Sequence, residues 1–138
     1  RCEFNSHWVH MSTKEFGNLG ERIAENYLKN KGYQILDKNY SFWIAGSPRK
    51  GEIDIVAKKD DTISFVEVKT LRLAQGRFIS PEEKVNFLKQ RKLRMVAENW
   101  LMKKKLSLNQ KWQIDVIAIE VQNGRAKISH FENAVPYY

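Results

Sequence analysis

Cysteine and histidine are scarce in this sequence of 138 residues, which contains one cysteine and three histidines. The cysteine, Cys2, and two of the histidines, His7 and His10, fall within the first ten residues. The remaining histidine is His130, near the other end of the sequence. A disulfide framework and a zinc site built from cysteine and histidine are therefore excluded for the body of the chain.

Long hydrophobic runs are also absent. No apolar stretch approaches the roughly 20 residues that span a bilayer, and the start lacks the pattern of a secretory signal peptide. We therefore expect a soluble, cytoplasmic protein. Residues 1–10 do not resemble the rest, and we expect them to be an appended remnant ahead of a natural start at Met11. Residues 11–138 suffice for a single domain with one core.

Acidic residues are outnumbered, because 24 Lys and Arg face 16 Asp and Glu and give a net charge of +8. The excess gathers in residues 81–105, where eight basic residues accompany three acidic ones. The basic residues are Lys84, Lys89, Arg91, Lys92, Arg94, Lys103, Lys104 and Lys105. Such a cluster on one predicted helix indicates a polyanionic partner such as nucleic acid. A solvated helix face has the same composition, so charge alone leaves both interpretations open.

Hydrophobic periodicity predicts seven elements in the order α-β-β-β-α-β-β. Apolar residues spaced by three and four predict helices over 13–31 and 81–105. Alternating or strongly apolar stretches predict strands over 33–40, 52–58, 63–69, 112–121 and 126–131. Glycine, proline and basic residues predict a loop or an irregular hairpin connection over 41–50 and a loop over 71–81. Short turns predict two hairpins. The fold class is therefore α/β, with a mixed sheet flanked by helices.

Charged residues interrupt the second and third predicted strands. Asp54 lies between two isoleucines, and Glu67 and Lys69 alternate with valines. With a period of two, Glu52 and Asp54 share one face of their strand, and Glu67 and Lys69 share one face of the next. If these faces coincide across the hairpin, Asp54, Glu67 and Lys69 converge and the opposite faces form core. The alternative is an ion pair on the exposed face of an edge hairpin.

Two carboxylates beside a lysine suit metal-dependent phosphodiester hydrolysis. Mg²⁺ binds one or two carboxylates together with substrate phosphate and water. The cation stabilises charge that develops on the phosphate and makes water a better nucleophile. The lysine can position that water, and it offsets repulsion between the two acids.

These residues also carry a resemblance. An Asp followed by Glu-X-Lys across a hairpin, after a helix with a glutamate, resembles the PD-(D/E)XK nuclease superfamily. Further matching stretches occur in order from Lys14 to Ala134, and together they resemble the YraN family of small bacterial proteins, which is similar to archaeal Holliday-junction resolvases. The stretches are FG at 16–17, GERIA at 20–24, GY at 32–33, GEID at 51–54, FVEVKT at 65–70, KQRKL at 89–93 and FENA at 131–134.

The resemblance implies a restriction-endonuclease-like fold and a role for each matching residue. Asp54 and Glu67 would bind Mg²⁺ or Mn²⁺ with the backbone carbonyl of Val68, and Lys69 would be the catalytic lysine. Glu21 on the first helix would complete the metal site. The proline of the superfamily motif is absent here.

Accessory roles are implied for two further residues, Glu52 in the GEID stretch and Gln90 on the second helix. Phosphates of the nucleic acid would be held by basic residues beyond the metal site. These are Arg72, Arg77, Lys84, Lys89, Arg91, Lys92 and Arg94. We expect structural roles for Asp115, His130, Trp100 and Trp112.

The function expected from sequence is a Mg²⁺- or Mn²⁺-dependent DNA endonuclease acting on branched or junction DNA. A homodimer would allow one site per chain to cut two strands symmetrically. One alternative is a non-catalytic nucleic-acid-binding module on the nuclease scaffold. Another is a partner protein of a DNA-processing helicase.

Overall fold

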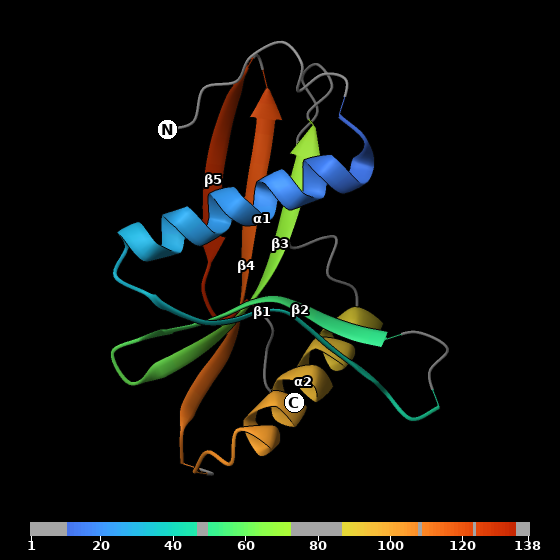
Figure 1. Ribbon diagram of the computed structural model, residues 1–138, viewed down its shortest axis with the longest axis vertical. Helices are drawn as coiled ribbons and strands as arrows, with labels where there is room; N and C mark the ends of the chain where they lie inside the picture. Colours follow the sequence, from blue (N-terminus) through green and yellow to red (C-terminus); the bar gives the residue numbers. More distant parts are fainter. Residues whose placement is uncertain (1–10, 47–49, 73–86, 108, 123, 135–138) are drawn as a thin grey trace.

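The fold is a five-stranded mixed sheet with a helix on each face (Figure 1). The computed structural model describes residues 11–46, 50–72, 87–107, 109–122 and 124–134, without the side chains of 87–91 and 122. Its elements are α1 (Thr13–Asn30), β1 (Gln34–Trp43), β2 (Lys50–Lys59), β3 (Thr62–Arg72), α2 (Phe87–Lys103), β4 (Lys111–Gln122) and β5 (Arg125–Phe131). The predicted fold class and element order are confirmed.

The strands follow the order β1-β2-β3-β4-β5, so each lies beside its neighbours in sequence. β3 and β4 are parallel and the other pairs are antiparallel. The parallel pair requires a crossover, which α2 supplies. In Figure 1, β1 and β2 run across the direction of β3, β4 and β5.

Helix α1 begins with a capping box in which the Ser12 hydroxyl accepts a hydrogen bond from the Glu15 amide, and the Glu15 carboxylate accepts one from the Ser12 amide. This arrangement satisfies two backbone donors that the first turn leaves without partners. The helix packs its apolar side against one face of the sheet. The core cluster there contains Ile23, Ala24, Leu28, Ile55, Ala57, Val66, Ile117 and Ile119.

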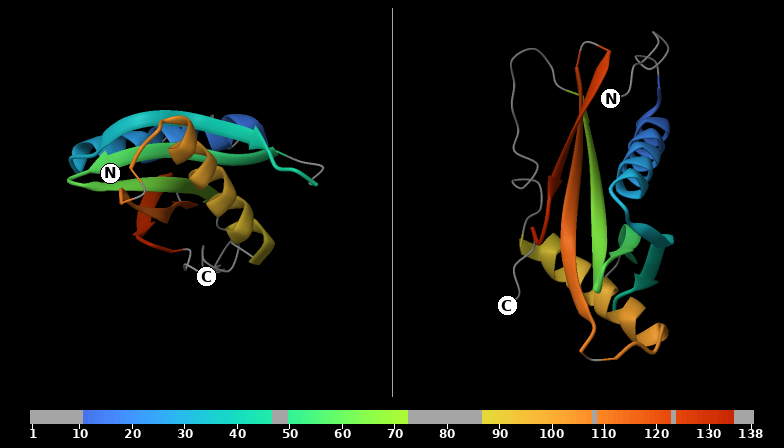
Figure 2. Two further views of the ribbon diagram at one scale, coloured as in Figure 1. Left: turned by 90° about the horizontal axis from the view of Figure 1, so that it is seen from below. Right: turned by 90° about the vertical axis from the view of Figure 1, so that its left-hand side faces the viewer.

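Helix α2 covers the opposite face, as both views of Figure 2 show. Its core cluster contains Ile44, Ile53, Val56, Ile63, Phe65, Leu93, Val96, Ala97, Trp100, Ile114 and Val116. Trp100 donates a hydrogen bond from Nε1 to Asp37 Oδ2 at 3.0 Å and meets Phe65 edge-on. Trp112 packs partly buried against the same ring. Both tryptophans are therefore structural, as predicted.

Several predicted boundaries are wrong. The segment 41–50 joins two antiparallel strands, as the hairpin alternative predicts, but it is shorter than predicted because β1 extends to Trp43 and β2 begins at Lys50. β3 likewise continues through Leu71 to Arg72, since it pairs with β4 along its whole length. Helix α2 ends at Lys103, and Lys105 adopts a left-handed backbone with φ of 55°. The predicted start of this helix at residue 81 lies outside the described residues.

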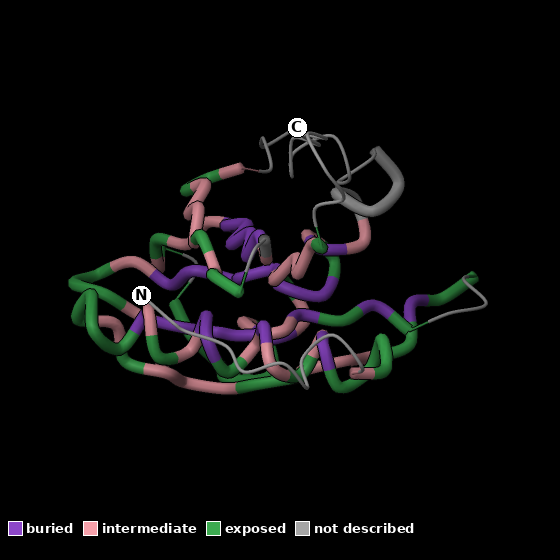
Figure 3. The backbone as a smooth tube through the Cα atoms, turned by 90° about the horizontal axis from the view of Figure 1, so that it is seen from above, coloured by how far each residue is buried: buried purple, intermediate pink, exposed green. Residues whose placement is uncertain are grey.

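The expectation that the hairpin has one core face and one charged face is also wrong. Val56 and Phe65 lie on the side of the charged residues, yet both are fully buried beneath α2. Ile55 and Ala57 are buried beneath α1, so both faces of the hairpin are core. Figure 3 shows buried segments on both layers of the fold. The charged residues occupy only the end of the hairpin, where the two strands separate.

None of the helices in the described ranges is both long and apolar enough to cross a bilayer.

Candidate active site

The site forms where β2 leaves β3. The ladder between these strands ends at the pair Ile55 and Val66. The next residue of β2, Asp54, continues the contact with its side chain, because Asp54 Oδ2 accepts a hydrogen bond from the Val68 amide at 2.8 Å. Side-chain alternation breaks at the same point, since Ile53 packs under α2 and Ile55 under α1. Asp54 therefore lies where the two strands separate, at a point that is open toward both faces of the sheet. We call this point the fork; Asp54 enters it from β2, and Glu67 and Lys69 enter it from β3.

Asp54 and Glu67 form a close pair of carboxyl groups, in which Asp54 is half-buried. Glu67 is only 9% exposed. Burial, followed by the negative charge of Glu67, raises the pKa of Asp54 to about 7, although the hydrogen bond from the Val68 amide opposes the shift. Two acids this close favour sharing a proton or binding a cation over being ionised together.

Lys69 is the third member of the group. Its Nζ lies 3.7 Å from Glu67 Oε1, and its side chain is 23% exposed. The two residues are separated by one position on β3, so their side chains leave the strand on the same side. The positive charge offsets part of the repulsion within the carboxyl pair while remaining accessible from solvent.

Glu21 approaches the fork from α1. Its neighbour Gly20 is buried against Thr70, and a Cβ at position 20 would clash with the Thr70 hydroxyl. This close approach of helix and strand brings Glu21 near the acids of the sheet. Burial, and then the charges of Glu52 and Glu67, raise the pKa of Glu21, whereas Lys38 lowers it.

Two hollows meet at Asp54. The larger, about 300 Å³, is lined by Asn18, Glu21, Arg22, Glu25, Lys38, Asn39, Asp54 and Ile55. The smaller, about 190 Å³, is lined by Lys50, Gly51, Glu52, Asp54, Glu67, Lys92 and Leu93. Each hollow therefore places two basic side chains beside the acids, which suits a chain of phosphates that passes the fork.

The donor set fits a divalent cation. Within the described ranges, no group of three or more Asp, Glu, His or Cys residues is arranged to hold a metal ion by itself. Mg²⁺ does not require such a cage, because it binds one or two carboxylates and completes its shell with water and substrate phosphate. The raised pKa of Asp54 beside Glu67 is the electrostatic condition that a cation would relieve.

Comparison with known proteins identifies the family of the chain. A model described as "Uncharacterised protein family UPF0102" matches residues 20–119. A UPF0102 protein of Alkaliphilus oremlandii (strain OhILAs) is 44% identical over 123 residues, which cover 88% of this chain and 97% of the relative. One of Clostridioides difficile (strain 630) is 42% identical over 124 residues, which cover 90% and 99%.

The chain belongs to the UPF0102 family. The predicted YraN resemblance is thereby confirmed, since UPF0102 is that family. The matched residues 20–119 include Glu21, Asp54, Glu67 and Lys69. The stretch of this chain that matches the UPF0102 model thus contains all four residues of the candidate metal site.

The structure places some of the expected nucleic-acid-binding residues at the fork and others away from it. Lys92 lines the smaller hollow, beside Glu52 and Asp54. Arg72 lies away from these acids, where Nη2 donates a hydrogen bond to the Met11 carbonyl at 3.2 Å and the guanidinium covers the Phe16 ring. Arg94 is half-buried on α2. The other expected contacts, Arg77, Lys84, Lys89, Gln90 and Arg91, lie outside the described residues or have side chains outside them.

Sequence reasoning missed three basic residues of the fork in this UPF0102 chain. Arg22 and Lys38 line the larger hollow and Lys50 lines the smaller one. Arg22 follows Glu21 in the GERIA stretch, which was one signal that could have identified it. Lys38 and Lys50 carry no motif, and only the strand register brings them to the site.

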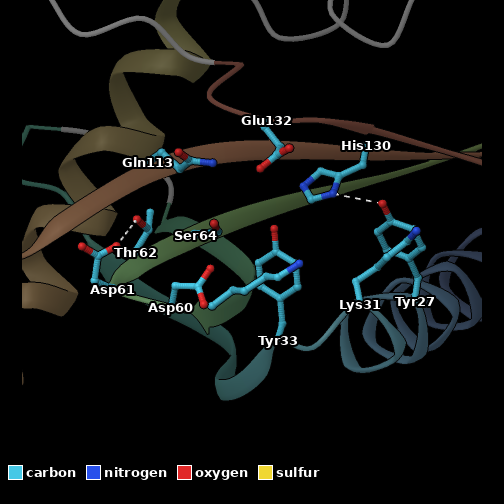
Figure 4. Close-up of a pocket in the computed structure, with 11 residues that line it drawn as sticks. Tyr27, Lys31, Tyr33, Asp60, Asp61, Thr62, Ser64, Gln113, His130 and Glu132 are labelled. Carbon is cyan, nitrogen blue, oxygen red and sulfur yellow. Dashed lines mark hydrogen bonds between the residues drawn. The ribbon is translucent and has the colours of Figure 1, made fainter.

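A second polar pocket, of about 450 Å³, lies at the other end of α1 (Figure 4). His130 lines it and connects Tyr27 to Asp115, with Nδ1 3.2 Å from the Tyr27 hydroxyl and Nε2 2.8 Å from Asp115 Oδ2. Asp115 is fully buried and also accepts hydrogen bonds from the Asn133 amide and the Gln113 side chain. Asp115 and His130 are thus structural, as predicted, and they tie α1 to β4 and β5.

Proposed function

We propose that this protein is a Mg²⁺- or Mn²⁺-dependent DNA endonuclease whose substrates are branched or junction DNA. The observation that carries the proposal is the close Asp54–Glu67 pair, in which burial and the charge of Glu67 raise the pKa of Asp54 to about 7, with Lys69 Nζ 3.7 Å from Glu67. Paired carboxylates next to a lysine, set between basic hollows, suit the metal-assisted hydrolysis of a phosphodiester.

Each residue of the fork has a part in this proposal. Asp54 and Glu67 would hold the cation, with the Val68 carbonyl and Glu21 as further ligands. When bound, the cation supplies positive charge to the scissile phosphate and acidifies water. Lys69 would orient the attacking water and neutralise charge at the reacting phosphate. The amide of Val68 fixes the Asp54 carboxyl by its hydrogen bond of 2.8 Å.

Phosphates on either side of the scissile bond would contact the two hollows. Arg22 and Lys38 line one, and Lys50 and Lys92 line the other. A backbone that crosses the fork would therefore meet two positive charges before Asp54 and two after it. Glu52, which is exposed in the smaller hollow, would be an accessory residue near the cation.

A cleavage assay tests the proposal. The protein is incubated with four-way junction, flap, duplex and single-stranded DNA, with Mg²⁺, Mn²⁺ or EDTA. We expect cleavage that requires the metal and falls at least 100-fold in Asp54→Asn and Lys69→Met, while DNA binding persists. Removing a group that acts in the transition state costs about this much. Glu98→Gln, an exposed acid on α2, is the matched control.

Metal binding is tested separately from activity. A cation that binds only the folded chain stabilises it by about 2.7 kcal/mol at 100 times its dissociation constant. We expect Mn²⁺ or Mg²⁺ to raise the free energy of unfolding of the wild type and not of Asp54→Asn. DNA binding without cleavage or metal stabilisation would instead establish a non-catalytic binding module.

A further inference from the structure

Trp43 is the most exposed aromatic residue in the described part of the chain, with 63% of its surface accessible. It ends β1, directly across from Lys50 at the start of β2. The Lys50 ammonium lies over the indole, 5.6 Å from the ring centroid. A cation covers one face of the ring and leaves the other accessible. Single exposed apolar residues are common, so position and neighbours must decide whether this one has a role.

The position connects Trp43 to the proposed active site. Its cross-strand partner Lys50 lines the smaller hollow together with Asp54 and Glu67. Lys50 and Asp54 are four positions apart on β2, a distance of about 13 Å along the strand. In Figure 3 the ends of β1 and β2 extend past the rest of the fold. Trp43 therefore lies at the outer end of the hairpin, next to the smaller hollow that leads to the fork.

The chemistry of this pair selects one kind of ligand. An accessible indole face stacks on nucleobases of any identity, and a lysine beside it attracts the phosphate. Bases within a duplex are stacked on their neighbours, so only an unpaired or displaced base offers a free face. The other tryptophans of the described ranges, Trp100 and Trp112, are packed around Phe65 and cannot do this.

We propose that Trp43 is a stacking platform for an unpaired nucleobase, whose phosphate is held by Lys50. This inference rests on the proposed function and narrows its substrate class. The substrate is DNA with an unpaired nucleotide within about four nucleotides of the phosphate at Asp54, taking 3.4 Å per nucleotide along a strand. Perfect duplex lacks such a nucleotide and is a poorer ligand.

Binding is measured first, in EDTA so that nothing is cleaved. Fluorescence anisotropy compares a 20-base-pair duplex with the same duplex carrying a three-nucleotide gap. We expect the wild type to bind the gapped DNA about ten-fold more tightly, a ratio that Trp43→Phe retains and Trp43→Ala loses. An abasic gap should abolish the preference in the wild type. Met102→Ala removes an even more exposed apolar residue, near the end of α2, and should change nothing.

Stacking is observed directly with 2-aminopurine in the gap. Its fluorescence should be quenched by the wild type and Trp43→Phe, and not by Trp43→Ala. Because Trp43 is largely exposed, these variants should unfold at the same urea concentration as the wild type. Equal binding of gapped DNA by wild type and Trp43→Ala would overturn the inference.

Cleavage then separates this inference from the proposed function. If no DNA is cut with either metal, yet Trp43→Ala loses the preference for gapped DNA, the nuclease proposal fails and the stacking site stands. If wild type and Trp43→Ala cut duplex and gapped DNA at equal rates, the nuclease proposal stands and the stacking site fails.

Discussion

At the scale of single residues, Asp54 combines two roles that are usually separate. Its carboxyl accepts a hydrogen bond from the Val68 amide, in place of a backbone carbonyl, and it also forms the close acid pair with Glu67. The first role stabilises the fold and the second opposes it. The balance between them should depend on pH.

The sign follows from the proton affinities of the two states. The pKa of Asp54 is about 7 in the folded chain and near 3.8 otherwise. The folded state therefore binds the proton more tightly, so the contribution of this group to stability is full below about pH 4 and is lost as pH rises toward 7. Above pH 7 the ionised pair opposes folding, by up to about 4 kcal/mol at 1.36 kcal/mol per pKa unit.

Asp54→Asn should therefore stabilise the metal-free protein at pH 8 and have little effect at pH 4.5. Urea unfolding at the two pH values measures the difference, and Glu98→Gln should change stability by less than about 0.5 kcal/mol at both. A variant that is less stable than the wild type at pH 8 would contradict the raised pKa.

At the scale of elements, the approach of α1 to β3 positions Glu21. Gly17 and Gly20 lie one turn apart on the helix, but their surroundings differ. A Cβ at Gly17 would have no neighbour within 4 Å, whereas at Gly20 it would collide with Thr70. The pair offers a matched test of the packing between this helix and strand.

We expect Gly17→Ala to stabilise the protein by about 1 kcal/mol, because alanine is the better helix former. Gly20→Ala should instead destabilise it by about 1–3 kcal/mol, since overpacking forces the helix from the strand. The double variant Gly20→Ala/Thr70→Ala should regain most of the lost stability. Free energies of unfolding in urea measure all three, and equal effects at positions 17 and 20 would contradict the packing.

The sequence predicted the parts of the site that depend on residues close together in the chain, and missed the parts that depend on distant ones. Glu67 and Lys69 share a face through strand geometry alone, and the Asp60–Asp61 turn fixed the hairpin that brings Asp54 near them. The end of the ladder at Ile55 could not be predicted, because it follows from packing against two helices on opposite faces. Lys38 and Lys50 were missed because only the register between β1 and β2 brings them to the site.

At the scale of the whole molecule, charge should dominate affinity for DNA. The net charge is +8, and four basic side chains line the two hollows: Arg22, Lys38, Lys50 and Lys92. Each phosphate contact contributes about 0.9 to the dependence of log K on log salt concentration. We expect a slope of roughly −3 to −4, reduced by about 1 in Lys92→Ala. A slope near zero would exclude these contacts.

Symmetric cleavage of two strands requires two sites, and we expect a homodimer with two-fold symmetry on junction DNA. Sedimentation velocity of the protein with and without a four-way junction measures this directly. Two chains per junction are expected, and the two incisions should be related by symmetry. A single chain per junction that nicks one strand would contradict the dimer.

The order of the sheet has a consequence for motion at the fork. β3 is the central strand, held on both sides by β2 and β4, and it carries Glu67 and Lys69. Asp54 belongs to β2, beyond the point where the ladder to β3 ends. One half of the acid pair thus sits on the most protected strand, and the other on a hairpin whose outer end opens at a lower free energy. The Val68 amide donates the hydrogen bond that connects β3 to Asp54. Its hydrogen should exchange with deuterium faster than the amides of β3 that pair with β2 inside the ladder. A bound cation should slow this exchange.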